Sequence, residues 1–345
     1  MGNLSRNFYI KNSNISTTNR ENNNPSMFYE GLGWCCAFGL ESIAIILGNL
    51  LTIGAFAKKK YLRKRGTYLL INLATADVFI GIIPIPLYIY FIGIQFQLWQ
   101  AYFLKTITYV FYVADILLGV ASLGNLTIVA LERLYAAKKP FRYRTLHPRY
   151  YYTAIAVTWT LACAIAIFCF SALYLTSNYI ISTYTSMIVV FIAFILITTS
   201  YSIVWSRLKL HSSKNYRKAS ENERKLGVTM IILTVLSLSA WLPFVIMNLV
   251  VVFAKLTVDN YIIIHATKLL HFGNSLTNCF VYAWRMPDFR RAVLKLIKLG
   301  KHDNSGQNSP VETSAISPLH NSRRPQYSRA LSNYSPQHRL SMKAL

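Results

Sequence analysis

Long apolar segments alternate with short polar segments along the chain of 345 residues. A helix of about 20 mostly apolar residues crosses the hydrocarbon core of a bilayer. Seven segments are long enough, and they lie approximately at 33–57, 67–94, 102–136, 150–174, 181–208, 225–253 and 260–284. The pattern therefore predicts an all-α membrane protein in which residues 33–284 form a bundle of seven transmembrane helices.

The residues outside these segments predict three further parts. Residues 1–32 are polar and rich in Asn, and their sequons at Asn3 and Asn14 predict glycosylation of an extracellular tail. Residues 285–299 alternate apolar and basic side chains at helical spacing, which predicts an amphipathic eighth helix lying against membrane lipid. Residues 300–345 are rich in Ser, Asn, Pro and Arg, and they predict a disordered cytoplasmic tail.

The basic residues set the expected orientation. The formal net charge is +24, and a strongly basic chain can bind nucleic acid. Here, however, the bases cluster in alternate connections, at 58–65, 137–149 and 207–225, while 95–101 and 175–180 carry no charge. An excess of Lys and Arg marks cytoplasmic loops. We therefore expect a multi-pass plasma-membrane protein with its N-terminus outside and its C-terminus inside, and no binding of nucleic acid.

Ionisable side chains within the apolar segments are candidates for function, because a charge at membrane depth is costly and needs a partner. Five lie well inside the segments and two lie nearer the ends: Asp77, Asp115, Glu132, Arg133 and Lys268, then Glu41 and Lys105. Asp115 precedes Arg133 by 18 residues, which is five helical turns and about 27 Å. The two therefore share one face of the third segment, at opposite ends of it.

Six short motifs stand in a fixed order across the apolar segments. They are Gly48-Asn49, the stretch Asn72 to Asp77, Glu132-Arg133-Leu134, Trp159, the stretch Ala240 to Phe244, and Asn278-Cys279-Phe280-Val281-Tyr282. In this order, over residues 35–298, the chain resembles a rhodopsin-like (class A) G-protein-coupled receptor. The resemblance implies a receptor that signals to a heterotrimeric G protein, with receptor kinases and arrestin acting at the serine-rich tail.

The resemblance also implies a cytoplasmic activation switch. Arg133 would pair with Glu132 and, in the resting state, with Glu223 at the inner end of the sixth helix. Tyr201, Asn278 and Tyr282 match family positions that reorganise in the active state. Trp241, which precedes Pro243, matches the position where the family's sixth helix bends.

A sodium ion is the one bound cofactor that the resemblance implies. Asp77 is expected to share the family's sodium pocket with four oxygen-bearing side chains, Ser122, Asn274, Ser275 and Asn278. Oxygen ligands suit a hard cation. The alternative is a protonated Asp77 that is hydrogen-bonded to the same groups.

Two hypotheses for the ligand site remain open. Asp115 stands where biogenic-amine receptors bind the ammonium of the ligand, and the expected site around it comprises Thr185, Ser186, Trp241, Phe244, Lys268 and Phe272. Alternatively, Lys268 pairs with Asp115 and forms an internal latch. The opsin lysine corresponds to Phe272, which argues against bound retinal.

Some positions depart from the family pattern. Thr108 replaces the usual cysteine of the third helix, Ala193 replaces a proline of the fifth, and Cys279 replaces the proline of the seventh. The first two departures, with a short loop after the fourth helix, resemble melanocortin-like receptors, so a peptide or lipid ligand is an alternative. Two further alternatives for the function are a non-signalling protein of this fold and a seven-span transporter. No motif for covalent catalysis is evident, and we do not expect an enzyme.

Overall fold

The computed structural model of the protein describes residues 25–58, 66–176, 179–210, 217–253 and 260–303. Helices from Pro25 to Lys301 pack into one compact unit. Within the described residues the secondary structure is helical: α2 (Pro25–Lys58), α3 (Thr67–Ile82), α4 (Pro84–Gln95), α5 (Leu104–Lys138), α6 (Pro140–Arg144), α7 (Arg149–Thr176), α8 (Tyr179–Leu210), α9 (Arg217–Phe253), α10 (Tyr261–Arg285) and α11 (Pro287–Asp303).

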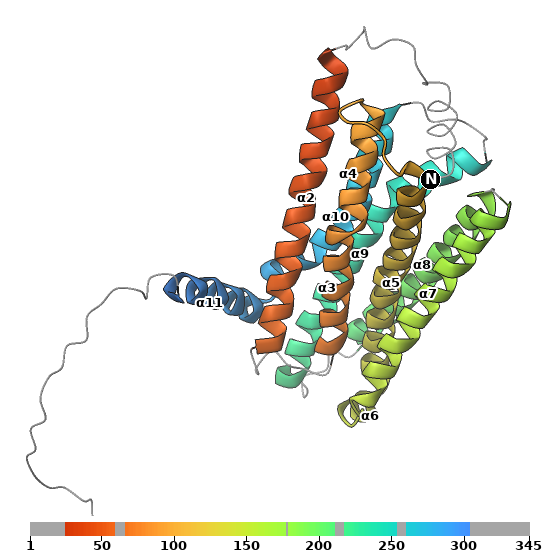
Figure 1. The fold of residues 1–345 in the computed structure, drawn as a ribbon. Coiled ribbons are helices and arrows are strands. Elements are labelled where there is room, and N and C mark those ends of the chain that lie inside the picture. Colours follow the sequence, from red (N-terminus) through yellow and green to blue (C-terminus); the bar gives the residue numbers. More distant parts are fainter. Residues whose placement is uncertain (1–24, 59–65, 177–178, 211–216, 254–259, 304–345) are drawn as a thin grey trace, which may run out of the picture. The chain divides into compact units, whose positions relative to one another are not determined.

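The long helices lie side by side as a bundle (Figure 1). In the described part of the chain, six stretches are apolar and long enough to cross a membrane: Pro25–Lys58, Thr67–Gln95, Leu104–Lys138, Arg149–Thr176, Ile180–Arg207 and Ile231–Val250. α10 is the seventh member of the bundle. It is less apolar because its buried face carries His265, Lys268, His271, Asn274 and Asn278. The polar side chains of α10 point into the protein. Because ionisable groups at membrane depth usually have a function, α10 is a candidate to contribute residues to a functional site.

The second membrane span consists of two helices, α3 and α4, with a break at Ile83. Pro84 begins α4 and has no N–H to donate, so the backbone cannot continue the helical ladder of α3. The N–H of Ile83 still bonds to the carbonyl of Phe79 at 2.9 Å, and the two helices remain one span.

The expected polar tail over 1–32 is too long, because α2 already begins at Pro25. Proline is favoured at the first position of a helix, where its missing N–H would have no partner. Gly31 is buried against Phe96 at the end of α4, so this extra turn is packed. The sequons at Asn3 and Asn14, and most of the expected tail 300–345, lie outside the described residues.

α11 is the eighth helix that the sequence predicts, and it turns away from the axis of α10 (Figure 1). Phe289 is buried, with its ring 5.3 Å from Phe56 and 5.8 Å from Tyr282. Arg290 and Arg291 on the other side of the helix are exposed. α11 is therefore fastened to the bundle by its apolar side, as an amphipathic helix requires.

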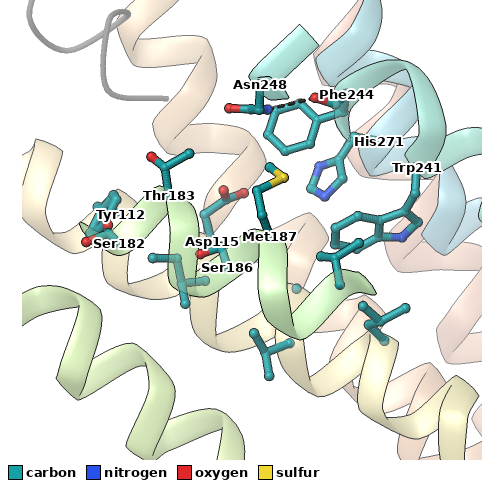
Figure 2. Close-up of a pocket in the computed structure, with 15 residues that line it drawn as sticks. Tyr112, Asp115, Ser182, Thr183, Ser186, Met187, Trp241, Phe244, Asn248 and His271 are labelled. Atoms are coloured by element: carbon teal, nitrogen blue, oxygen red, sulfur yellow. Dashed lines mark hydrogen bonds between the residues drawn. The ribbon is translucent and has the colours of Figure 1, made fainter. Parts of the chain in front are cut away.

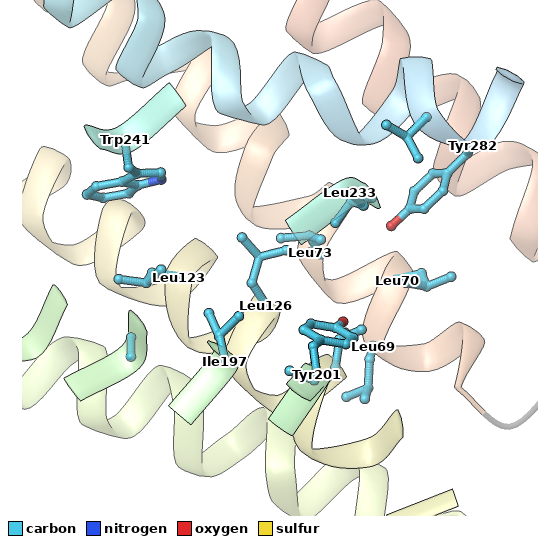
Figure 3. Close-up of a cluster of buried hydrophobic side chains, with 14 of the residues drawn as sticks. Leu69, Leu70, Leu73, Leu123, Leu126, Ile197, Tyr201, Leu233, Trp241 and Tyr282 are labelled. Atoms are coloured by element: carbon cyan, nitrogen blue, oxygen red, sulfur yellow. The ribbon is translucent and has the colours of Figure 1, made fainter. Parts of the chain in front are cut away.

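Three apolar clusters of described residues fill the interior of the bundle, and the smallest joins Ile116 of α5 to Ala166 and Cys169 of α7. The largest one joins α3, α5, α8, α9 and α10 through side chains that include Leu73, Leu126, Ile197, Leu233 and Tyr282 (Figure 3). The remaining one joins α2, α4, α5 and α10 around Phe38, Tyr88, Phe111 and Phe272. Large apolar side chains such as Leu40, Ile167 and Ile195 are instead exposed on the outside. Exposed apolar surface of this extent fits a protein embedded in lipid.

Hydrogen bonds made by polar side chains connect neighbouring helices. The amide of Asn72 on α3 donates to Asn125 on α5 at 2.5 Å, and Trp159 on α7 donates to Asn72 at 3.0 Å. On the other side of the bundle, Asn49 of α2 donates to the carbonyl of Ser275 on α10 at 3.2 Å. These contacts restrict the rotation of the five helices about their own axes.

Hydrogen bonds of Tyr90 and Trp99 stabilise the connection between α4 and α5. The hydroxyl of Tyr90 donates to the carbonyl of Tyr102 at 2.5 Å and accepts from the N–H of Tyr102 at 2.7 Å. The indole of Trp99 donates to the carbonyl of Tyr90 at 3.0 Å. All five cysteines of the chain are free thiols.

Substituting Gly81 by alanine should destabilise the bundle, because α2 and α3 meet there without a side chain between them. A Cβ at Gly81 would lie 2.7 Å from Ile46 and 3.2 Å from the carbonyl of Ser42. We expect a loss of about 1–3 kcal/mol, typical of overpacking. Gly39→Ala is the matched control, since a Cβ there meets nothing within 4 Å. Thermal melting in detergent measures both, and equal melting temperatures would contradict the close contact.

Candidate functional site

A cavity of about 70 Å³ lies between α5, α8, α9 and α10, and Figure 2 shows the side chains around it. Asp115 is its one acidic residue among those described. The other lining residues are mostly apolar or aromatic: Tyr112, Ile116, Gly119, Val120, Leu123, Ser182, Thr183, Ser186, Met187, Val190, Trp241, Phe244, Asn248 and His271. An apolar cavity with few polar groups is the usual form of a small-molecule site.

Asp115 is not free, because it forms a buried ion pair with Lys268 of α10. The ammonium of Lys268 lies 2.8 Å from one carboxylate oxygen and 3.0 Å from the other. The exposed fractions are 3% for the Lys268 side chain and 8% for that of Asp115, so water screens the pair little. Removing one partner of such a pair leaves a buried charge and costs about 3–5 kcal/mol. The pair therefore holds the third and seventh spans together.

Aromatic rings surround the ammonium of Lys268. Its nitrogen lies 4.4 Å from the ring centre of Phe272, 4.8 Å from that of Phe244 and 5.8 Å from that of Phe111. A cation above the face of a ring is stabilised by the negative potential of that face. The predicted residues Phe244 and Phe272 thus contact Lys268, and Phe244 also lines the cavity.

His271 links this ion pair to Trp241 on α9, and the sequence prediction did not include it. Its Nδ1 lies 3.4 Å from the ammonium of Lys268. Its ring packs against Trp241 at 4.3 Å and against Phe244 at 4.5 Å, as Figure 2 shows. The spacing could have revealed it, since residues three apart on a helix face the same side.

The hydroxyls of α8 that face the cavity are only partly those predicted. Ser186 lines the cavity, but Thr185 is not among the lining residues and bonds to the carbonyl of Ile181 on its own helix. Ser182 and Thr183 line the cavity instead. Each residue turns a helix by about 100°, and Ser182, Thr183, Ser186 and Met187 share one side of α8, whereas Thr185 lies outside it. The expectation for Thr185 therefore does not fit the geometry.

The five residues of the expected sodium site come together around Asp77, which is fully buried. The carboxylate accepts from Ser122 at 3.2 Å and from the Asn278 amide at 2.7 Å. The side-chain oxygens of Asn274 and Asn278 are buried and, among the described residues, have no hydrogen-bond donor. A small cavity of about 10 Å³ is lined by Asp115, Ser122, Asn274, Ser275 and others, so it lies between this cluster and the ion pair.

Arg133, near the C-terminal end of α5, pairs with its neighbour Glu132 at 2.5 Å. Tyr143 of α6 joins them, because its hydroxyl donates to Glu132 at 2.6 Å and accepts from Arg133 at 3.3 Å. Burial raises the pKa of the Tyr143 phenol above its ordinary value, so it remains a donor. Glu223 belongs to α9, but its side chain lies outside those described, and the predicted pair with Arg133 stays a prediction.

The two predicted tyrosines of the switch are buried in the large apolar cluster (Figure 3). Tyr201 comes from α8, and its exposed fraction is 7%. Tyr282 comes from α10 with 1% exposed. Leu126, Leu233 and the other members of the cluster separate their helices at the level of the switch.

The fold and this site define a membrane receptor whose bundle has seven transmembrane spans. The sequence matches the family "7 transmembrane receptor (rhodopsin family)" over residues 48–282. The chain belongs to this family, the rhodopsin-like G-protein-coupled receptors.

Curated relatives include receptors for amines by name. The D(1) dopamine receptor of Carassius auratus is 24% identical over 331 residues, covering 76% of this chain and 87% of that receptor. The histamine H4 receptor of Homo sapiens is 39% identical over 108 residues, covering 31% of this chain. Dopamine receptor 4 of Caenorhabditis elegans is 36% identical over 129 residues, covering 36% of this chain. The matches span 26% and 24% of the lengths of these last two receptors.

Replacing Tyr143 by phenylalanine should raise basal signalling. The change removes one hydrogen bond from Glu132 and one from Arg133, which loosens the contacts that hold the arginine. One such bond contributes about 1 kcal/mol, a roughly fivefold shift in the resting equilibrium. G-protein activation measured in cells without ligand tests this. Tyr150→Phe is the matched control, since Tyr150 is exposed, and an equal rise there would contradict the role of Tyr143.

Proposed function

We propose that this receptor responds to a biogenic amine, whose ammonium binds the carboxylate of Asp115. The observation that carries the proposal is the buried acidic side chain at the wall of a mostly apolar cavity. A buried carboxylate attracts a cation much more strongly than an exposed one does. The names of the relatives, dopamine and histamine receptors, support the same ligand class.

The remaining cavity suits the aromatic part of such a ligand. Trp241 and Phe244 offer ring surfaces, and polar groups come from Ser182 and Ser186 on α8 and from Asn248 on α9. Aromatic ligands pack edge-on or offset against such rings, and ring hydroxyls or ring nitrogens can bond to the polar groups. The narrow volume of about 70 Å³ indicates that the helices move apart slightly when the ligand enters.

Lys268 occupies the ammonium position in the ligand-free protein, and this reconciles the two hypotheses for the site. The distance of 2.8 Å between Lys268 and Asp115 is that of a charge-assisted hydrogen bond. An amine ligand replaces this internal cation on the same carboxylate. The latch thus keeps the empty receptor silent, and its release is the first step of signalling.

The release reaches the sixth helix through His271. This ring contacts both Lys268 and Trp241, so a movement of Lys268 alters the packing of Trp241. Pro243, two residues later, interrupts the hydrogen-bond ladder of α9 and provides a bend. An outward swing of the cytoplasmic half of α9 then opens a cleft beside Arg133 for a heterotrimeric G protein.

The proposed receptor also has an expected location and expected protein partners. It resides in the plasma membrane with its N-terminus outside, as the distribution of bases indicates. Receptor kinases and arrestin act at the serine-rich tail, and α11 lies in the lipid interface. The receptor works by conformational change and carries out no covalent chemistry.

Substituting Asp115 by asparagine should abolish the response to amines. Losing the charge removes at least about 3 kcal/mol of attraction, which is more than a hundredfold in affinity. Basal signalling should rise, because Lys268 loses its partner. G-protein activation by dopamine and by histamine, with surface expression recorded, measures both effects.

Lys268→Met should instead strengthen amine binding, since the internal competitor for Asp115 is gone. Lys105→Met serves as the control, because Lys105 is exposed on the same helix as Asp115. An Asp115→Asn receptor that reaches the surface and responds normally would contradict the amine assignment.

We also propose a sodium ion at Asp77, held by Ser122, Asn274, Ser275 and Asn278. The support is the set of side-chain oxygens, two of them buried without a donor among the described residues. The ion would neutralise a carboxylate that is otherwise buried with hydrogen bonds alone. Its charge would stabilise the resting arrangement of α3, α5 and α10.

Sodium should raise the melting temperature of the receptor, because an ion that binds only the folded state stabilises it. NaCl is compared with choline chloride at equal ionic strength in detergent. The difference should vanish in Asp77→Asn and persist in Asp288→Asn, which changes an exposed carboxylate on α11. A sodium effect that survives in Asp77→Asn would place the ion elsewhere.

A further inference from the structure

Glu41 on α2 is a second, half-buried carboxylate near the ligand site, and the proposed mechanism does not use it. Its Oε2 atom is buried and has no hydrogen-bond partner among the described residues. Its Oε1 atom lies 3.2 Å from where a Cβ of Gly273 would be, so the carboxylate rests against α10. An ionisable group at membrane depth without a partner is rare and marks a function.

The cation on the same part of α10 is Lys268: its ammonium lies 4.4 Å from the ring centre of Phe272, the residue next to the Gly273 against which Glu41 rests. Lys268 therefore stands between two carboxylates, Asp115 on α5 and Glu41 on α2. It hydrogen-bonds to Asp115 and leaves one oxygen of Glu41 unpaired. Counted as ionised, the three side chains sum to −1. One further positive charge would complete two ion pairs.

We propose that Glu41 is the second acceptor of Lys268. When the ammonium of the ligand takes Asp115, the ammonium of Lys268 moves to Glu41. The inference rests on the proposed amine function, and it names the charge of the ligand: a single cation with no anionic group. Without Glu41, each binding event would leave a buried lysine unpaired, which is strongly unfavourable.

α2 and α10 pack closely together on both sides of Glu41. α2 and α10 are already joined, because Asn49 donates to the carbonyl of Ser275 and Gly48 approaches Cys279 closely. Phe38, one turn before Glu41, packs against Phe272 at 6.3 Å. Lys268 has a flexible four-carbon chain, and the Phe272 ring can stabilise its ammonium.

A zwitterionic ligand, such as an amino acid, would use Lys268 differently, since its carboxylate would take the lysine. The structure favours the single cation for two reasons. Lys268 is not among the residues that line the cavity, whereas Asp115 is. A zwitterion would also leave the net charge of −1 uncompensated.

Binding of dopamine and histamine to four receptors tests the proposal: wild type, Glu41→Gln, Lys268→Met and the double variant. Glu41→Gln should weaken binding about tenfold or more in the wild-type background, and by less than about twofold beside Lys268→Met. An equal loss in both backgrounds, or no loss in either, would overturn it. L-3,4-dihydroxyphenylalanine and L-histidine serve as carboxylated counterparts, and tighter binding of these amino acids would favour the zwitterion instead.

A measurement without ligand separates this inference from the amine assignment. In Asp115→Asn, Lys268 loses its first acceptor and should pair with Glu41. Adding Glu41→Gln should therefore lower the melting temperature more in Asp115→Asn than in the wild type. Equal decrements would overturn the role of Glu41. A larger decrement in Asp115→Asn, together with no binding of either amine to any receptor, would refute the amine assignment alone.

Discussion

The ion pair between Asp115 and Lys268 places two opposite charges at a depth where neither is stable alone. Everything that defines the site lies around this pair: three aromatic rings about the lysine, a histidine at its nitrogen, and a cavity against the aspartate. Because each charge depends on the other, breaking the pair weakens the contact between the third and seventh spans, which the apolar cluster of Phe111 and Phe272 otherwise maintains. A ligand that supplies its own cation thus acts on the contact that the bundle most needs.

Trp241 connects the surroundings of the ion pair to the rest of the bundle. It lines both cavities and packs against His271, and it also belongs to the large apolar cluster that contains Tyr201 and Tyr282. Close-packed interiors transmit a displacement, because they have few voids to absorb it. The cavity beside Asp115 and the small cavity beside the Asp77 cluster therefore share Trp241, which also packs in the same apolar cluster as Tyr201 and Tyr282.

Much of this organisation could be predicted from the sequence, since a membrane span imposes its length and its apolar character on the chain. The seven segments and the membership in the receptor family are confirmed. His271, Ser182, Thr183 and Tyr143 were not predicted, because their roles depend on how each helix is rotated and on what packs opposite. The start of α2 at Pro25 was also missed, because its first turn is polar enough to resemble a tail.

The hydrogen bonds of Tyr90 with Tyr102, and of Trp99 with Tyr90, have a consequence for the redox conditions that this part of the receptor tolerates. The connection between α4 and α5 depends on phenol and indole donors, and every cysteine in the chain is a free thiol. Thiol reductants leave such bonds intact, whereas they break a cystine. The connection between α4 and α5 therefore keeps its hydrogen bonds in reducing and in oxidising surroundings alike.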